Sequence, residues 1–147
     1  MEKFTNFAVR IEFKAMVISR NEYIKQLVSK SWNKRIKIIT GIRRCGKSFL
    51  LNTLYREYLL VNGVSADAII SVDLEKKSDA KYRNPITLYD YIIKTTADVT
   101  KRHYVFIDEI QMSVKVKNPD LEGIEVPESD EDMLYITFYD ILNDLIA

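Results

Sequence analysis

Two features that the sequence lacks bear on where the protein is found. The 147 residues include a single cysteine, Cys45, so the chain cannot form an internal disulfide, and this favours a reducing compartment. No apolar run approaches the roughly 18 residues that span a bilayer. The opening stretch, MEKFTNFAVRIEFKA, also lacks the apolar core of a secretion signal. The sequence therefore predicts a cytoplasmic protein with no membrane partner.

An overall excess of one charge sign is also missing. Lys and Arg number 22 and Asp and Glu 21, which gives a net charge of +1 and no global argument for a nucleic-acid partner. The charges are unevenly distributed, because residues 1–60 carry 13 basic and 4 acidic side chains (+9), whereas residues 61–147 carry 9 and 17 (−8). The basic part suits an anionic ligand, and internal pairing of the two parts is the alternative explanation.

Short apolar segments alternate with helical patterns along the chain. The strand candidates are too continuously apolar for a sheet with one face in water. They are residues 35–40 (RIKIIT), 68–74 (AIISVDL) and 103–110 (HYVFIDEI). The helix candidates are residues 19–32, 47–63, 84–99 and 133–147. With 47% hydrophobic residues, this alternation predicts one α/β domain built around a parallel sheet.

Several of these helices have recognisable ends or faces. Ser19 and Glu22 form a capping box, and Asn84 caps the third helix with Pro85 at its first position. The second helix ends at Gly63 and places the following apolar residues near one face: Phe49, Leu50, Leu54, Tyr58 and Val61.

The last part of the chain changes in character. Residues 118–132 contain two prolines, no basic residue and seven acids, namely Asp120, Glu122, Glu125, Glu128, Asp130, Glu131 and Asp132. We interpret this segment as a solvated loop, with a binding tail as the alternative. The closing helix over residues 133–147 is apolar on almost every side, so we expect it to require burial on both faces.

One loop stands out chemically. Residues 41–48 fit the pattern G-x-x-x-x-G-K-[ST] at every fixed position, between a predicted strand and a predicted helix. The residues are Gly41, Ile42, Arg43, Arg44, Cys45, Gly46, Lys47 and Ser48. This context predicts a nucleotide-binding loop that grips phosphate.

The residue types match the requirements of phosphate binding. Gly41 and Gly46 allow backbone conformations that point several N–H groups at one phosphate, and the helix dipole adds positive potential. Lys47 reaches the β and γ phosphates, while the Ser48 hydroxyl binds Mg²⁺ and Phe49 begins the burial of the helix.

The variable positions of the loop have weaker interpretations. Arg43 or Arg44 contacts nucleotide or a neighbouring subunit, and a solvated pair is the alternative. The thiol of Cys45 is either exposed to modification that would block binding or a bystander.

Two carboxylates end the third predicted strand. In the run VFIDEIQ, Asp108 and Glu109 would be delivered to the edge of the sheet. There Asp108 can hold Mg²⁺ through water, and Glu109 can orient or deprotonate an attacking water. Asp73 and Glu75 end the second strand in a similar way, and we interpret them as caps of the next turn rather than as a second acid pair.

These motifs carry a resemblance to a known family. RIKIITGIRRCGKSFLL together with HYVFIDEIQ resembles the predicted prokaryotic ATPases of the AAA superfamily, which join an N-terminal ATPase domain to a C-terminal domain of unknown function. The resemblance implies a P-loop three-layer sandwich over residues 19–147, after an N-terminal extension of residues 1–18. It also implies ATP and Mg²⁺ as ligands, with Lys47 and Ser48 on phosphate and magnesium and with Asp108 and Glu109 in hydrolysis.

The chain departs from that family in one respect. A sensor strand follows the closing helix in the family, lies between the loop strand and the acidic strand, and is followed by segments that supply an arginine. We expect this sequence to be a partial ATP-binding domain that stops before the sensor strand. A second copy of the chain and a downstream domain are the candidate protein partners, besides the nucleotide.

Two alternative functions fit the same residues. The first is a nucleotide-binding module that does not hydrolyse ATP or has degenerated. The second is a P-loop phosphotransferase, against which Glu109 directly after Asp108 favours water activation.

Overall fold

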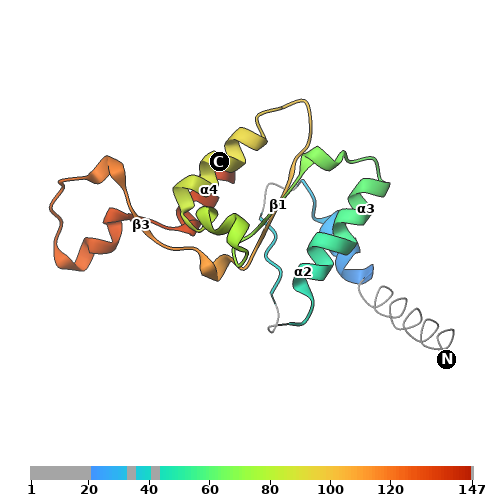
Figure 1. Ribbon diagram of the computed structural model, residues 1–147, viewed down its shortest axis with the longest axis horizontal. Coiled ribbons are helices and arrows are strands. Elements are labelled where there is room, and N and C mark those ends of the chain that lie inside the picture. Colours follow the sequence, from blue (N-terminus) through green and yellow to red (C-terminus); the bar gives the residue numbers. More distant parts are fainter. Residues whose placement is uncertain (1–20, 33–35, 41–43, 147) are drawn as a thin grey trace. The chain divides into compact units, whose positions relative to one another are not determined.

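Figure 1 shows the computed structural model of the protein, which describes residues 21–32, 36–40 and 44–146. The chain forms two compact units, residues 1–63 and residues 64–147. In the part of the chain that is described, no helix is both long enough and apolar enough to cross a membrane.

The described residues of the first unit are mainly helical. Residues 21–29 form a helix, as predicted, although Ser19 of the expected capping box lies outside the described residues. A longer helical run consists of α2 (Lys47–Phe49), the π-helical segment η1 (Leu50–Tyr55) and α3 (Arg56–Val61). Gly63 follows with a φ of 87°, a left-handed conformation that glycine adopts freely, so the predicted stop signal is confirmed.

The strand predicted for residues 35–40 is not formed by its described part. Residues 36–40 have no regular secondary structure, and the side chains of Ile36 and Ile38 are 40% and 68% exposed. A strand needs a neighbour for its backbone N–H and C=O groups. The resemblance places the sensor strand beside this segment, and none of the described residues pairs with it. An apolar β-branched pattern was therefore insufficient evidence for a strand here.

The buried face of the second helix also differs from the prediction. Leu50 and Leu54 are buried as expected, but Tyr55 and Leu59 join them, whereas Val61 is 86% exposed. The cause is the π-helical segment, in which Arg56 donates its N–H to the carbonyl of Leu51, five residues back. The wider turn rotates the following residues relative to a regular α-helix.

The second unit contains the parallel sheet that the sequence predicts. Strand β1 (Ile69–Asp73) pairs with β2 (Tyr104–Asp108), from Ile69 opposite Tyr104 to Asp73 opposite Asp108. Between them the chain forms the 3₁₀ segment η3 (Lys77–Arg83) and helix α4 (Pro85–Thr95), in a strand–helix–strand connection (Figure 1). The unit also contains 3₁₀ turns η2 (Ala66–Ala68) and η4 (Ile110–Met112), and helix α5 (Phe138–Ile146). An α/β fold is thereby confirmed.

The core of this unit lies where β1, α4 and α5 meet. It consists of seven buried residues: Ile70, Val72, Leu74, Leu88, Ile92, Phe138 and Ile141. Leu74 and Leu88 have no exposed surface. Because Leu74 follows directly after Asp73, this packing anchors the end of β1 that carries an acid.

Asn84 caps helix α4 as the sequence predicts. Its side-chain oxygen accepts hydrogen bonds from the backbone N–H groups of Ile86 at 3.0 Å and Thr87 at 3.4 Å, and Pro85 occupies the first turn. These two N–H groups have no partner within the helix, so the cap satisfies donors that water would otherwise have to satisfy.

We expect Asn84→Ala to lower the free energy of unfolding by about 1 kcal/mol, the usual cost of removing such a cap. Urea denaturation followed by circular dichroism measures the change. Asn143→Ala is the matched control, because Asn143 is exposed on helix α5 and alanine is the better helix former there. Equal losses in the two variants would contradict a capping role for Asn84.

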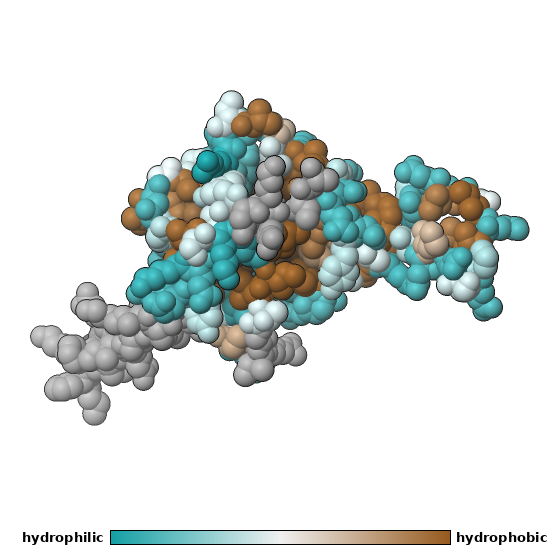
Figure 2. Space-filling view, turned by 180° about the vertical axis from the view of Figure 1, so that it is seen from behind, coloured by the Kyte–Doolittle hydropathy of each residue, from teal (hydrophilic) through white to brown (hydrophobic). Residues whose placement is uncertain are grey.

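The acidic segment lies in the loop of a small antiparallel ribbon. Strands β3 (Val116–Lys117) and β4 (Tyr135–Ile136) pair, and the loop between them contains the 3₁₀ turns η5 (Pro119–Leu121) and η6 (Glu128–Leu134). In Figure 1 the loop projects away from the sheet and α4. All seven acids are exposed, as expected of a solvated loop, and Figure 2 shows both hydrophilic and hydrophobic residues at its surface.

The closing helix is shorter and more one-sided than predicted. It begins at Phe138, because residues 133–137 form the end of η6, strand β4 and a cap. Phe138 and Ile141 are buried, whereas Tyr139 is 68% exposed, so burial on both faces is not required. Asp140 accepts hydrogen bonds from the hydroxyl and the N–H of Thr137, both at 2.7 Å, and these bonds lower the pKa of Asp140.

Candidate functional site

The end of the glycine-rich loop is the first element of the candidate site. Gly46 has φ 87° and ψ 29°, in the left-handed region, and helix α2 begins at the next residue, Lys47. The Gly46 carbonyl then accepts the first helical hydrogen bond, from Leu50 N at 2.9 Å. A residue with a Cβ would be strained at Gly46, which gives a physical reason for the second glycine of the motif.

The side chains at this turn are accessible to a ligand. Arg44, Cys45 and Ser48 are exposed, while Lys47 and Phe49 are half-buried. The Lys47 ammonium lies 4.0 Å from the sulfur of Cys45, so the lysine side chain lies beside the loop that precedes it. Arg44 also has a positive φ, of 63°. The motif residues 41–43 lie outside the described residues.

The carboxyl end of the two-stranded sheet is the second element. The parallel register places Asp73 directly opposite Asp108, and the N–H of Leu74 donates to the Asp108 carbonyl at 3.2 Å. Two neighbouring strands therefore end in an acid at the same level. The end of an open parallel sheet is where α/β proteins bind their ligands. The sequence predicted Asp108 at this edge and placed Asp73 at the end of the second strand, but it did not predict that the two residues lie opposite each other.

Glu109 has an unusual backbone conformation. Its φ of 55° and ψ of 46° are left-handed, and its N–H donates to the Asp108 carboxylate at 3.0 Å. The Glu109 carboxylate in turn accepts a hydrogen bond from the side-chain amide of Gln111. A non-glycine residue held in this region is strained, and such strain is concentrated at ligand-binding and catalytic positions.

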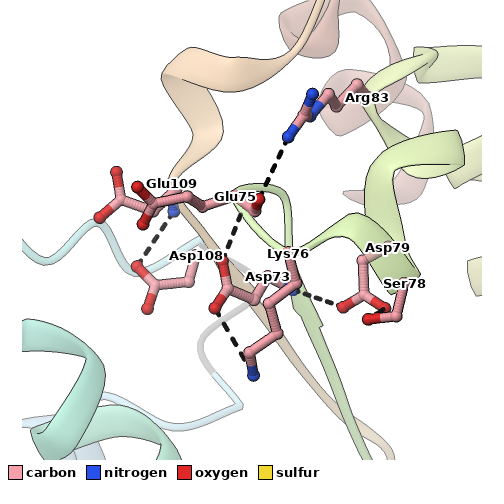
Figure 3. A network of polar contacts seen from close by, with 8 residues as sticks. All are labelled: Asp73, Glu75, Lys76, Ser78, Asp79, Arg83, Asp108 and Glu109. Atoms are coloured by element: carbon pink, nitrogen blue, oxygen red, sulfur yellow. Dashed lines mark hydrogen bonds and ion pairs between the residues drawn. The ribbon is translucent and has the colours of Figure 1, made fainter.

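Asp73 mainly organises the loop that follows β1 (Figure 3). Its carboxylate accepts the N–H of Glu75 at 3.0 Å and lies 3.6 Å from the Lys76 ammonium. Its own N–H donates to the Asp79 carboxylate at 3.0 Å. The expectation that Asp73 caps the next turn is confirmed, whereas Glu75 is exposed and takes part through its backbone.

Arg83 connects this loop to the segment that follows β2. Its guanidinium donates to the carbonyls of Leu74 at 2.7 Å and Glu75 at 3.2 Å. Its own carbonyl accepts the N–H of Val114 at 3.0 Å and the hydroxyl of Ser113 at 3.1 Å. Sequence reasoning missed these contacts, because bonds to backbone carbonyls leave no pattern in the side chains.

The predicted site residues fall into two groups. Lys47 and Ser48 belong to the first unit, and Asp108 and Glu109 lie together in the second. Among the described residues, no group of three or more His, Cys, Asp or Glu side chains is arranged to hold a metal ion. A Mg²⁺ site of the P-loop type needs no such group, because this ion retains waters and binds one or two protein oxygens together with nucleotide phosphates.

Comparison with known proteins identifies the family. A family model described as an AAA domain matches residues 33–122, a range that includes the glycine-rich loop and the acidic pair. The chain belongs to the AAA domain family. Both groups of predicted site residues therefore lie within the range that this one family model matches.

A relative of this AAA domain is an uncharacterized protein of Haemophilus influenzae. The two are 35% identical over 98 residues, which are 67% of this chain and 24% of that protein. The AAA domain chain thus spans about a quarter of the length of this relative. No solved structure matches the chain.

Proposed function

We propose that this AAA domain binds ATP with Mg²⁺ and that the complete protein hydrolyses ATP. The observation that carries the proposal is the left-handed Gly46 immediately before a helix that begins at Lys47, within a complete G-x-x-x-x-G-K-[ST] motif. Family membership supports nucleotide binding in general. The roles of individual residues, and hydrolysis itself, are our inference from their chemistry.

Lys47 and the loop residues 41–46 would hold the phosphates. The ammonium of Lys47 would interact with the β and γ phosphates, and backbone N–H groups of the loop would bind phosphate oxygens. The Ser48 hydroxyl is exposed at the start of the helix, where an oxygen donor suits Mg²⁺. Asp108 would be the second residue to hold Mg²⁺, through water.

Glu109 would act on the water that attacks the γ phosphate. Its carboxylate would orient that water or accept its proton, while the neighbouring Asp108 would help to hold Mg²⁺. When bound, Mg²⁺ neutralises charge on the phosphates. The hydrogen bond from Gln111 gives the Glu109 carboxylate a defined direction.

The proposal also covers the extent of the domain, its three-layer architecture and the location of the protein. We infer an ATP-binding domain over residues 19–147, with the three-layer sandwich of P-loop proteins, in a cytoplasmic protein. The parallel pair β1–β2 supports the sandwich. These strands are neighbours, and Asp108 and Glu109 lie at the carboxyl end of the pair, where such folds bind ligands. Besides the nucleotide, a further domain and a second copy of the chain are the candidate protein partners.

A thermal melt with and without Mg·ATP tests the binding step. A ligand bound by the folded state raises its stability, by about 2.7 kcal/mol at a free concentration 100 times Kd. We expect wild type to show an upward shift and Lys47→Ala to lose it. Lys30→Ala is the matched control, because Lys30 is exposed and lies outside the motif. The proposal fails if wild type does not respond to Mg·ATP or if Lys47→Ala retains the full shift.

A further inference from the structure

We propose that Arg83 is a positioning residue for Glu109, which it holds through the backbone of the two segments on either side. The inference rests on the proposed function, since it concerns the residue that we place on the attacking water. Glu109 is held in the left-handed region, at φ 55°. A strained conformation persists only where the surrounding structure over-determines it.

A closed ring of hydrogen bonds surrounds the turn that contains Glu109. The Asp108 carbonyl accepts from Leu74 N at 3.2 Å, and the Leu74 carbonyl accepts from Arg83 Nε at 2.7 Å. The Arg83 carbonyl then accepts from Val114 N at 3.0 Å. The chain from Asp108 to Val114 closes the ring. Within it the Glu109 carbonyl accepts from Met112 N at 2.9 Å, so both ends of the turn and its middle are fixed.

Arg83 is the only residue that takes part in this ring through its side chain, since the other bonds join backbone groups. Its second guanidinium bond, to Glu75, fixes the loop after β1 at a further point, as Figure 3 shows. A planar guanidinium with donors in a fixed fork suits two successive carbonyls, whereas a lysine ammonium has no such geometry. Removing the fork would therefore loosen the loop after β1, which Asp73 and Asp79 also hold, and with it one side of the Glu109 turn.

The conformation of Glu109 in solution tests the proposal without nucleotide. Backbone chemical shifts and the three-bond HN–Hα coupling of Glu109 report its φ, and the comparison is wild type, Arg83→Met and Lys81→Ala. Arg83→Met keeps an apolar stem without donors, and Lys81 is an exposed cation of the same 3₁₀ segment. We expect Arg83→Met to shift the Glu109 signals away from the left-handed values while Leu88 and Ile92 keep theirs. Unchanged Glu109 signals in Arg83→Met, or the same change in Lys81→Ala, would overturn the proposal.

Hydrogen exchange of the wild-type chain gives a second test if Arg83→Met does not fold. The ring requires the amides of Leu74 and Val114 to become exchangeable in the same opening event. We expect their exchange rates to converge as urea is added. Opening of the two amides at different urea concentrations would show that no ring joins them, and would overturn the proposal.

Steady-state kinetics of phosphate release from ATP distinguish a positioning role of Arg83 from a merely structural one. We expect Arg83→Met to lower kcat about 10-fold to 100-fold with KM little changed, since misplacement of a reacting group has effects of this size. In a Glu109→Gln background the same change should cost nothing further. An equal loss in both backgrounds would assign Arg83 to stability alone. Failure of Mg·ATP binding refutes the proposed function, whereas the conformation of Glu109 is read without nucleotide.

Discussion

Glu109→Gln is expected to reduce phosphate release by about 10²-fold to 10⁴-fold, the usual contribution of a general base. The substitution keeps the size of the side chain and an oxygen that can accept the hydrogen bond from Gln111. It removes the negative charge that accepts a proton from water. Because Asp108 and Lys47 are unchanged, the rise in melting temperature with Mg·ATP should be retained. The measurements are phosphate release at saturating ATP and the melt.

Glu75→Gln is the control for this experiment. Glu75 is an exposed acid at the same edge of the sheet, and it forms hydrogen bonds to Asp73 and Arg83 through its backbone N–H and carbonyl. We expect phosphate release in this variant to match wild type. A loss equal to that of Glu109→Gln would mean that the charge of the edge, rather than one carboxylate, supports the reaction.

The same experiment separates the alternative functions. Wild type and Glu109→Gln that are equally silent, with Mg·ATP stabilisation intact, would favour a nucleotide-binding module without turnover. Release that is stimulated by a small hydroxyl-bearing acceptor would favour a phosphotransferase. ATP hydrolysis predicts neither result.

Leu88→Ala is expected to lower the free energy of unfolding by about 2–5 kcal/mol, the range for a fully buried leucine whose removal leaves a cavity. Leu88 has no exposed surface and lies in the core cluster with Ile70 and Val72 of β1. A loss of this size is a large fraction of the stability of a small domain. Urea denaturation measures it, with helix α4 and the sheet reported by circular dichroism.

Ile93→Ala provides the comparison on the same helix. Ile93 is five residues further along α4 and is 47% exposed, so its truncation removes less buried surface and leaves no enclosed cavity. We expect a loss of about 1 kcal/mol or less, typical of surface substitutions. Losses of similar size for Leu88 and Ile93 would contradict the assigned core.

The parallel sheet and its helix could be predicted because each has a local signal. Strands β1 and β2 are short apolar runs that end in acids, and α4 begins with the Asn84–Pro85 pair. Parallel pairing then follows from the strand–helix–strand connection, because a helical crossover returns the chain to the same edge of the sheet. The acidic pair was predicted at the correct strand end for the same reason.

Other parts depend on partners that are distant in sequence. The ribbon β3–β4 joins two-residue strands across a long acidic loop, and hairpin prediction relies on a short turn that is absent here. The 36–40 segment has a strand pattern without a described neighbour. Strand β4 also takes residues 135–136 that an apolar pattern assigned to the closing helix. In each case a long-range backbone pairing, or its absence, decided the outcome over local propensity.

The π-helical segment has a consequence for the geometry of the nucleotide loop. If one residue between Leu50 and Tyr55 were deleted, Leu50, Tyr55 and Leu59 would recur at intervals of four, as in an ordinary α-helix. The helix thus behaves as a regular one that has gained a single residue in its second turn. One residue corresponds to about 100° of rotation in an α-helix. This extra residue therefore sets the angle, around the helix axis, between Lys47 and Ser48 and the face that buries Leu59.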